Sequence, residues 1–386
     1  MVNKETRFWI LIALVTISGF SQGMLLPLLA IILEQNGVPS SVNGLHATGL
    51  YIGVLLASPF MEKPMQKFGF KPVILVGGAL VFISLAMFPV WEALWLWFML
   101  RVLIGVGDQM LHFGTQTWIT ATATKETRGK SIAYYGMFFG LGFTIGPLMT
   151  RLLSIHEALP FIVSALFSLL VWSSMLFVRN QWPKQGRGIA VSTTSWSRFK
   201  QTGKIAWVAL LPGFGYGFLE SSLHGIFPVY GMRLGHEVDM LSVLIPCFAA
   251  GSLITQLPLG IWSDRLGRRA ILLAVLVLGS VLFTMVAILE DHIPALFVLF
   301  VLAGMCVGSL YSLGIAYMTD LLPATLLPAG NLMIGVAFSL GSISGPFLGG
   351  VYVETFPGLS FFYLIVLILL MVAMAIFFRR KPQRAN

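Results

Sequence analysis

Charged side chains are scarce in this sequence of 386 residues, where Asp, Glu, Lys and Arg together make up only 10% of the chain. Soluble globular domains contain roughly 25% charged residues, so the composition excludes an ordinary soluble domain. Hydrophobic residues reach 57%, which indicates that most of the chain lies in lipid. The net charge is +9, but the basic residues fall in short loops between apolar runs. We therefore expect no nucleic-acid partner, which would require a basic face on a soluble domain.

Cysteine is nearly absent. Only Cys247 and Cys306 occur, and both lie inside apolar runs. This excludes a disulfide framework and a thiolate metal site, and we expect both residues to be small core residues. The six histidines show no metal-ligand spacing, and the sequence contains no phosphate-binding loop of the P-loop form. We therefore expect no metal, no cofactor and no enzymatic activity.

Long apolar runs dominate the chain. A helix needs about 20 apolar residues to cross the hydrocarbon core of a membrane, and the runs are continuous, which excludes the alternating pattern of a transmembrane barrel. The first run is too long for the apolar part of a signal peptide, so we expect it to be a transmembrane span. The twelve predicted spans are 8–33, 42–62, 72–90, 94–122, 129–152, 158–178, 205–231, 239–262, 269–289, 293–320, 326–352 and 357–378.

Basic residues are distributed very unevenly among the loops. If both termini are cytoplasmic, every Lys and Arg of the chain lies in an inner loop or a terminus, except Arg101, Arg151 and Arg233. Acidic residues such as Glu92 and Glu157 fall in the outer loops instead. The positive-inside rule therefore predicts that both termini are cytoplasmic and that the number of spans is even.

A polar stretch divides the spans into two groups of six. We expect an N-terminal six-helix bundle over 1–178, a cytoplasmic linker loop over 179–204 and a C-terminal six-helix bundle over 205–386. An internal repeat supports a duplication, because three glycine-containing patterns recur in the same order at an offset of about 199 residues.

The repeated glycines indicate close helix packing. Small residues one turn apart let a neighbouring backbone approach, and a proline introduces a kink. The pattern Gly-x-x-x-Gly-Pro occurs at Gly142, Gly146 and Pro147 and again at Gly341, Gly345 and Pro346. The other two matches pair Gly19 and Gly23 with Gly213 and Gly217, and the loop glycine Gly69 with Gly267.

One loop sequence resembles the loop motif of the major facilitator superfamily, Gly-x-x-x-Asp-Arg-x-Gly-Arg-Arg. The matching residues are Gly260, Asp264, Arg265, Gly267, Arg268 and Arg269. Asp264 lies near a helix end, where a carboxylate can pair with guanidinium groups and cap a neighbouring helix. The resemblance implies a conformational latch that stabilises the outward-facing state. The first-half copy has Gln66 in place of the aspartate and Phe70 in place of the first arginine after the loop glycine. Glu62 is a candidate substitute for the missing charge.

Two other stretches are similar to motifs of the same superfamily. Arg101, Gly105 and Gly107 match its Arg-x-x-x-Gly-x-Gly motif, which is linked to proton coupling, and the stretch 142–147 matches its antiporter motif. The stretches 45–48 and 107–112 also resemble the YcaD-type subgroup. The chain is therefore identified as a member of the superfamily. The resemblance implies an all-α integral membrane protein with twelve transmembrane helices in two pseudo-symmetric six-helix bundles, in the drug:proton antiporter-like branch. It also implies a monomer in the bacterial inner membrane.

Ionisable residues inside the spans are the candidate functional residues, because an unpaired charge in the bilayer is costly. Arg101, Asp108 and His112 are seven and four residues apart and share one helical stripe. Glu220 lies near the middle of the seventh span, with Tyr216 and His224 one turn away on either side. A further polar candidate in the first span is Gln22, near Ser18 and Ser21, and Trp118, Tyr311 and Tyr317 are candidate cavity aromatics.

Burial disfavours the charged form of a carboxyl group, so such a group can bind and release a proton near neutral pH. We hypothesise that Asp108 and Glu220, one in each half, form a proton-coupling and cation-recognition site in a central cavity. The alternative is that either carboxylate pairs with Arg101 or a histidine in a structural role.

The sequence therefore predicts a secondary active transporter that works by alternating access and exports a small amphipathic or cationic compound in exchange for protons. Proton-coupled uptake of a metabolite and flipping of a lipid-linked substrate are the alternatives. The expected partners are the small-molecule substrate, protons and membrane lipids.

Overall fold

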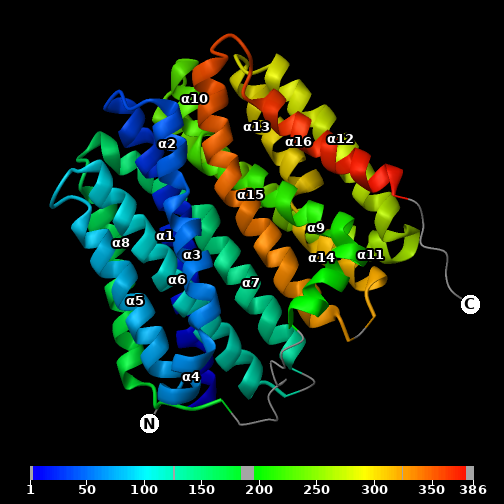
Figure 1. Cartoon of the computed structure of the whole chain (residues 1–386). Coiled ribbons are helices and arrows are strands. Elements are labelled where there is room, and N and C mark those ends of the chain that lie inside the picture. The colour runs from blue at the N-terminus through cyan, green and yellow to red at the C-terminus, as the bar shows by residue number, and fades with distance from the viewer. Residues whose placement is uncertain (1–2, 125–126, 184–194, 324, 380–386) are drawn as a thin grey trace, which may run out of the picture. The chain divides into compact units, whose positions relative to one another are not determined.

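The structure, a computed structural model, describes residues 3–124, 127–183, 195–323 and 325–379. Every regular element in these ranges is a helix (Figure 1), as the apolar runs predict. In the described part of the chain, nine helices are long and apolar enough to cross a membrane, and a bent helix pair over 40–68 would be a tenth. Each of the other predicted ranges also contains helix, but those helices are shorter or kinked.

The chain folds as two compact units. The first comprises Met1–Val38, Val42–Gly188 and Gly235–Pro246, and the second comprises Pro39–Ser41, Ile189–Leu234 and Cys247–Asn386. Most of the first unit thus comes from the first half of the chain and most of the second unit from the second half. Residues 184–194 of the predicted linker lie outside the described residues, and the division at 178 and 205 stays a prediction.

Local sequence explains where several helices of the first half begin and break. The Asn3 side chain caps the first helix by accepting a hydrogen bond of 2.7 Å from the Thr6 backbone N–H. Pro147, which has no N–H to donate, is the second residue of the 3₁₀ helix η2 (Gly146–Ser154), which follows the end of α7 (Arg128–Ile145). The elements are α1 (Lys4–Gln35), α2 (Ser40–Ala47), α3 (Gly49–Ala57), η1 (Ser58–Phe60), α4 (Glu62–Phe68), α5 (Phe70–Met87), α6 (Leu94–Thr122), α7 (Arg128–Ile145), η2 (Gly146–Ser154), α8 (Leu159–Ser174) and η3 (Met175–Phe177).

In the second half, prolines lie inside long helices, among them α9 (Ser195–Gly225) and α15 (Leu327–Thr355). Pro346 lies inside α15, which continues to Thr355, whereas its counterpart in the first half lies at a helix end. The seventh predicted span consists of two helices that meet at Ile226. The elements are α9 (Ser195–Gly225), α10 (Phe227–Arg233), α11 (Val238–Leu266), α12 (Arg268–Ile288), α13 (Ile293–Val307), α14 (Leu310–Leu321), α15 (Leu327–Thr355) and α16 (Phe362–Phe378).

The repeated glycines lie on one helix pair in each half. In the first half they join α1 to α7: a side chain on Gly23 would overlap the Phe143 carbonyl, and one on Gly142 would overlap the Thr16 carbonyl. In the second half they join α9 to α15 in the same way, through Gly217 and Gly341. The two halves therefore use the same backbone-to-backbone seam between their first and fifth spans, which explains why the glycine pattern recurs.

The loop glycines of the repeat both have a positive φ angle. Gly69 precedes α5 with φ of +88°, and Gly267 precedes α12 with φ of +96°. Residues with a Cβ rarely adopt such angles. A glycine is therefore required for the sharp connection between the second and third spans of each half.

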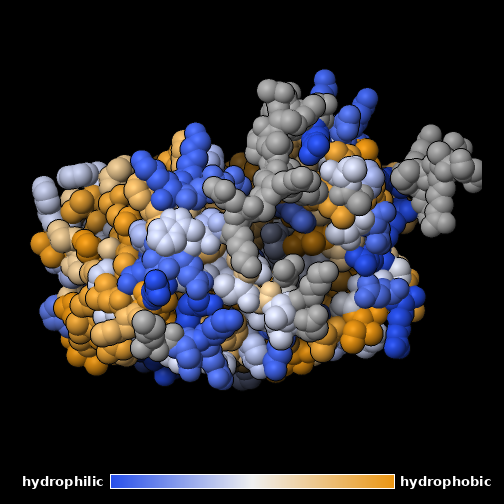
Figure 2. All heavy atoms as spheres, turned by 90° about the horizontal axis from the view of Figure 1, so that it is seen from below, coloured by the Kyte–Doolittle hydropathy of each residue, from blue (hydrophilic) through white to orange (hydrophobic). Residues whose placement is uncertain are grey.

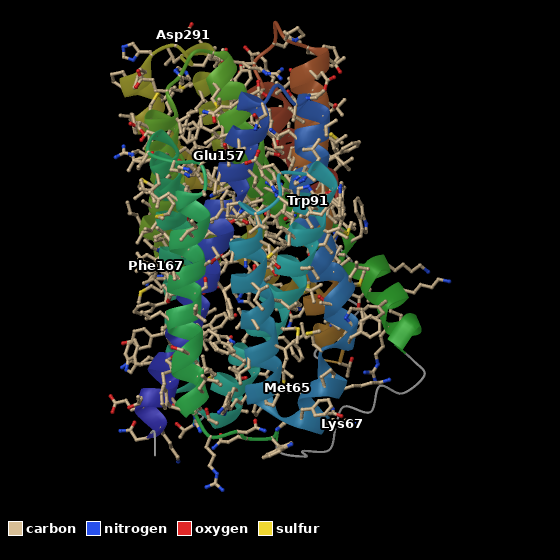
Figure 3. The ribbon with its side chains drawn as sticks, turned by 90° about the vertical axis from the view of Figure 1, so that its left-hand side faces the viewer. Met65, Lys67, Trp91, Glu157, Phe167 and Asp291 are labelled. Atoms are coloured by element: carbon tan, nitrogen blue, oxygen red, sulfur yellow. The ribbon has the colours of Figure 1, made fainter. Side chains whose placement is uncertain are left out.

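Side chains of the first unit are arranged as expected for a membrane-spanning bundle. Lys67 lies at the lower end of the unit and Glu157 at the upper end, while Phe167 points outward between them (Figure 3). Phe167 is 51% exposed, which suits a lipid-facing position. Figure 2 shows many hydrophilic residues on the side seen from below, and hydrophobic residues gather mainly at the left of that view.

Candidate functional site

The first candidate site is centred on Asp108, halfway along α6. Its side chain is fully buried, and its Oδ1 accepts a hydrogen bond of 2.6 Å from the Ser18 hydroxyl on α1. Its other carboxyl oxygen, Oδ2, is buried without a hydrogen-bond partner among the described residues. Because an ionised carboxylate with so few partners is unfavourable in an apolar interior, this carboxyl group is a natural carrier of a proton.

His112 lies next to this carboxyl group and connects three helices. Its Nε2 is 3.2 Å from the Ser18 hydroxyl and 3.4 Å from the Gln22 amide nitrogen, both on α1. Its Nδ1 is 2.5 Å from the hydroxyl of Tyr135 on α7. The structure thus brings the predicted residues Asp108, His112 and Gln22 into one cluster, which Ser18 and Tyr135 complete.

Arg101 does not belong to this cluster. It lies two turns from Asp108 along α6, is fully buried, and makes no ion pair within the described ranges. None of its three guanidinium nitrogens has a hydrogen-bond partner there. The side chain passes close to α3, since a Cβ on Gly49 would lie 3.2 Å from the Cβ of Arg101. The alternative that Arg101 neutralises Asp108 therefore receives no support from the described contacts.

The second candidate site lies on α9 around Glu220. The Tyr216 hydroxyl donates a hydrogen bond of 3.2 Å to Glu220 Oε1. His224 uses its Nδ1 to contact the Glu220 backbone carbonyl at 2.8 Å, so its ring is held by the helix backbone. The predicted trio of Tyr216, Glu220 and His224 is therefore linked along one face of the helix.

Aromatic rings from two other helices surround Tyr216. The Tyr216 ring centroid lies 6.5 Å from that of Tyr311 on α14 and 6.2 Å from that of Phe338 on α15. The rings of Tyr311 and Phe338 are 5.3 Å apart in an edge-on arrangement. We call Tyr216, Tyr311 and Phe338 the aromatic cluster. It places aromatic rings near a carboxyl group, and these are the two kinds of group that attract an organic cation.

In the loop motif of the second half, Arg268 makes most of the contacts. It pairs with Asp264 (Nη2 to Oδ1, 3.2 Å) and with Asp320 at the end of α14 (Nε to Oδ2, 3.2 Å). It also donates to the Ala316 carbonyl at 2.5 Å and to the Thr319 hydroxyl at 3.2 Å. Arg268 thus ties α12 to α14, and Asp264 acts through it.

The remaining motif residues contribute less to this tie. Arg269 donates a hydrogen bond of 2.7 Å to the Phe377 carbonyl at the end of α16. Arg265 is exposed, and Gly260 has no neighbour that would contact an added Cβ. Whether the motif switches between conformations stays a prediction.

In the first-half copy of the motif, amide groups take the place of the Asp264–Arg268 pair, while Lys71 keeps a charge and donates a hydrogen bond of 2.7 Å to the Leu176 carbonyl. Asn180, which lies shortly after η3, donates a hydrogen bond of 2.8 Å to the Phe68 carbonyl and accepts one of 3.0 Å from the Lys71 backbone N–H. The Gln181 carbonyl accepts 2.9 Å from the Phe70 N–H. Asn180 and Gln181 therefore provide hydrogen-bond partners for backbone groups on either side of Gly69. These backbone groups lie at helix ends and have no partner within the helices.

Stacked aromatic rings complete this amide tie. Phe70, in the position of the missing arginine, stacks on Trp118 of α6 with centroids 5.2 Å apart and an angle of 15°. The Trp118 indole N–H donates 2.9 Å to the Gln181 side chain, and the Arg7 guanidinium lies 5.5 Å from the indole ring. The suggested substitute Glu62 is exposed and makes no ion pair with the described residues.

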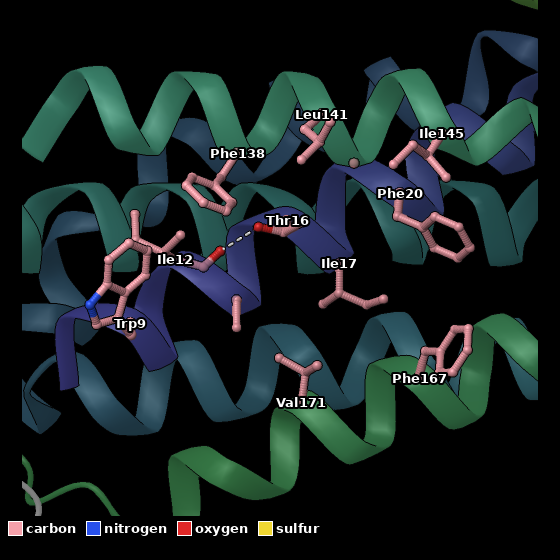
Figure 4. A pocket seen from close by; sticks show the side chains of 12 residues that line it. Trp9, Ile12, Thr16, Ile17, Phe20, Phe138, Leu141, Ile145, Phe167 and Val171 are labelled. Atoms are coloured by element: carbon pink, nitrogen blue, oxygen red, sulfur yellow. Dashed lines mark hydrogen bonds between the residues drawn. The ribbon is translucent and has the colours of Figure 1, made fainter. Parts of the chain in front are cut away.

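A separate groove of about 450 Å³ runs between α1, α7 and α8. Trp9, Phe20 and Phe167 are among the side chains that line it (Figure 4). Its lining residues include no ionisable group, so this groove offers surface for apolar chains and no acid–base chemistry.

Sequence reasoning overlooked Tyr135, Phe338 and the role of Asn180. Tyr135 had a detectable signal, since it lies seven residues before Gly142 and therefore on the same face of α7, toward α1. Phe338 had none, because phenylalanine is common throughout the apolar runs.

Comparison with known proteins agrees with this architecture. The sequence matches the model of the Major Facilitator Superfamily over residues 11–249 and 234–386. It is 52% identical over 373 residues to the uncharacterized MFS-type transporter YfkF of Bacillus subtilis (strain 168), covering 96% of this chain and 94% of the relative. The MFS-type transporter YcaD of Salmonella paratyphi B is 22% identical over 352 residues, covering 87% of this chain and 88% of the relative.

Solved structures with the same fold include two transporters. The nucleoside transporter NupG superimposes with a TM-score of 0.80 at 14% identity, covering 97% of this chain and 99% of its own. A bacterial homologue of the human lysosomal transporter Spinster gives 0.77 at 15% identity, covering 97% of both chains. At such low identity the likeness shows the fold alone. Together with the family match over both halves, it shows that the chain belongs to the major facilitator superfamily, as a multi-pass membrane transporter.

Proposed function

We propose that this transporter exports small cationic or amphipathic compounds in exchange for protons. The observation that carries the proposal is the Glu220 carboxyl group beside the aromatic cluster of Tyr216, Tyr311 and Phe338. The face of an aromatic ring attracts a cation electrostatically within about 6 Å of its centroid. A nearby carboxylate adds a full negative charge, and the rings also bind the apolar part of an amphipathic compound.

In this proposal Asp108 carries the coupled proton. Support comes from its complete burial, its hydrogen bond with Ser18 and its unpartnered second oxygen. A carboxyl group in such a position exchanges a proton more readily than it holds a permanent charge. Glu220 then recognises the cation, so that each half contributes one carboxyl group with its own task.

Proteoliposomes with an imposed pH gradient test this proposal, with tetraphenylphosphonium as the probe cation. We expect proton-driven movement of the probe. Glu220→Gln should weaken probe binding at least about tenfold, because the carboxylate charge is lost while the side-chain shape is kept. Asp108→Asn should abolish accumulation against a gradient but leave probe binding intact. The control Glu62→Gln changes an exposed carboxylate and should behave as the unaltered protein does. Gradient-driven transport at full rate by Asp108→Asn would contradict the proton role.

Nucleoside uptake is the second candidate. The same aromatic cluster offers stacking surfaces for a nucleobase, and a nucleoside transporter shares the fold. Adenosine, a neutral compound, separates the two proposals. Adenosine binding that survives Glu220→Gln, together with no response to tetraphenylphosphonium, would favour uptake of a nucleoside over export of a cation.

We also propose that the protein lies in the bacterial inner membrane with both termini cytoplasmic. The uneven distribution of basic residues supports this orientation, as does the position of Lys67 and Glu157 at opposite ends of the first unit (Figure 3). Single cysteines at these two positions, in a background without Cys247 and Cys306, test it. An impermeant maleimide applied to intact spheroplasts should label the cysteine at 157 and not the one at 67, and the reverse pattern would refute the orientation.

A further inference from the structure

Hydrogen bonds connect the buried Asp108 to a partly exposed tyrosine. From Asp108 Oδ1 the chain passes to the Ser18 hydroxyl (2.6 Å), then to His112 Nε2 (3.2 Å), and from His112 Nδ1 to the Tyr135 hydroxyl (2.5 Å). Asp108 and Ser18 are buried, whereas His112 and Tyr135 are partly exposed. Each member carries a group that can both donate and accept a proton.

The relay groups are arranged in order along the helix axes. Along α6, His112 lies one turn beyond Asp108 toward the end at Thr122. Tyr135 lies two turns into α7 from its start at Arg128. The path from Asp108 through His112 to Tyr135 therefore approaches the loop between α6 and α7. The proposed orientation places this loop on the cytoplasmic side.

Histidine suits the central position because its two nitrogens face different partners. With a proton on Nε2, the ring donates to Ser18 and accepts from Tyr135 on Nδ1. With a proton on Nδ1, it donates to Tyr135, and Nε2 accepts from Ser18 or from the Gln22 amide. The imidazole can therefore receive a proton on one side while it releases another from the opposite side.

We infer that Ser18, His112 and Tyr135 form a proton relay that connects Asp108 with the cytoplasmic side of the first unit. This rests on the proposed role of Asp108. In release, the O–H bond of the Asp108 carboxyl group breaks and Ser18 accepts that proton while passing its own to His112 Nε2. His112 gives its Nδ1 proton to Tyr135, and Tyr135 gives its proton to water. The relay groups end neutral, Asp108 ends ionised, and one proton is released. Loading runs through the same bonds in reverse.

Few other groups compete for this proton. Within the described part of the chain, the His112 ring contacts Ser18 and Gln22 from α1 and Tyr135 and Phe139 from α7, and Asp108 lies one turn away on its own helix. The Phe139 ring lies edge-on at 4.9 Å and offers no proton acceptor. Among these neighbours, Asp108 and Tyr135 are the titratable groups.

Infrared spectroscopy of the full-length protein in lipid tests the relay without any transported substrate. The carbonyl stretch of protonated Asp108 is identified as the band that Asp108→Asn loses, and its growth or decay after a pH jump gives the rate of proton exchange. We expect Tyr135→Phe and His112→Gln to slow this rate by at least about tenfold while the band persists. Gln keeps a hydrogen-bonding side chain at position 112 but does not pass protons as imidazole does, so slowing in both variants points to the relay.

The matched control is Tyr134→Phe, which removes the same hydroxyl from the adjacent position of α7. Tyr134 packs on Phe8, Trp9 and Phe138 and takes no part in the relay, so the rate should stay unchanged. Unaltered rates in both Tyr135→Phe and His112→Gln would overturn the relay. A wild-type spectrum without a carbonyl band that Asp108→Asn removes would instead overturn the proposed proton site itself.

Discussion

Replacing one glycine of the α9–α15 seam should destabilise the second half. A Cβ on Gly341 would lie 2.9 Å from both the Phe214 carbonyl carbon and the Phe218 backbone nitrogen, besides overlapping the Phe214 carbonyl oxygen. All three are backbone atoms, so no side chain can rotate away and the two helices must separate. Gly335 lies on the same helix, but a Cβ there would meet nothing within 4 Å. Gly335→Ala is therefore the matched control for Gly341→Ala.

The difference between these two variants isolates the packing cost. Each gains about 1 kcal/mol of helix propensity when glycine becomes alanine, and this gain cancels in the comparison. What remains is the cost of forcing extra atoms into a packed interior, about 1–3 kcal/mol. At roughly 2–4 °C per kcal/mol, Gly341→Ala should unfold about 2–12 °C below Gly335→Ala.

Thermal unfolding of the detergent-purified variants, followed by intrinsic tryptophan fluorescence, measures this difference. Gly335→Ala itself should be as stable as the unaltered protein or slightly more so. Equal midpoints for the two alanine variants would refute the idea that backbone contact at the seam holds α9 and α15 together.

Three further predictions follow from the ties between helices. Phe70→Ala should cost about 3–5 kcal/mol because a buried ring stacked on Trp118 is lost, whereas Phe68→Ala removes a 52% exposed ring and should change stability by less than about 0.5 kcal/mol. Asn180→Ala should cost about 1–2 kcal/mol, since it leaves backbone groups beside Gly69 without partners; an unchanged unfolding midpoint would count against the amide tie. Asp264→Asn should cost less than about 1 kcal/mol, since its pair with Arg268 is 65% exposed on the Asp264 side, and a double-mutant cycle with Arg268→Gln measures that coupling directly.

The fold was predictable because lipid imposes a strict requirement on backbone hydrogen bonding, which long apolar runs reveal. The glycine repeat was also visible in the sequence, but the helices that it joins were not. Glycine spacing shows which face of a helix carries small residues, but it does not show which helix packs on that face. Asp108 and His112 stood out as polar residues in apolar surroundings. Tyr135 did not, because a tyrosine on a membrane helix usually serves packing or the interface.

The amide tie shows a different limit. Asn180 and Gln181 lie at the start of a polar stretch that reads as a linker, and an amide's choice of backbone partner depends on tertiary position. Likewise, the loop motif pointed to Asp264, whereas the contacts centre on Arg268 and reach Asp320. Short-range patterns identified the motif but not its partner on α14.

The glycine seam between α1 and α7 has a consequence for the proposed proton relay. Because these two helices are held backbone to backbone, Ser18 and Tyr135 should move together as one rigid pair, whereas Asp108 and His112 lie on α6. A small tilt of α6 relative to α1 and α7 would lengthen the 3.2 Å contact between Ser18 and His112 and interrupt proton transfer along the proposed relay. In the proposed mechanism, the close packing of α1 on α7 would therefore stop protons from leaking through the relay whenever α6 is displaced.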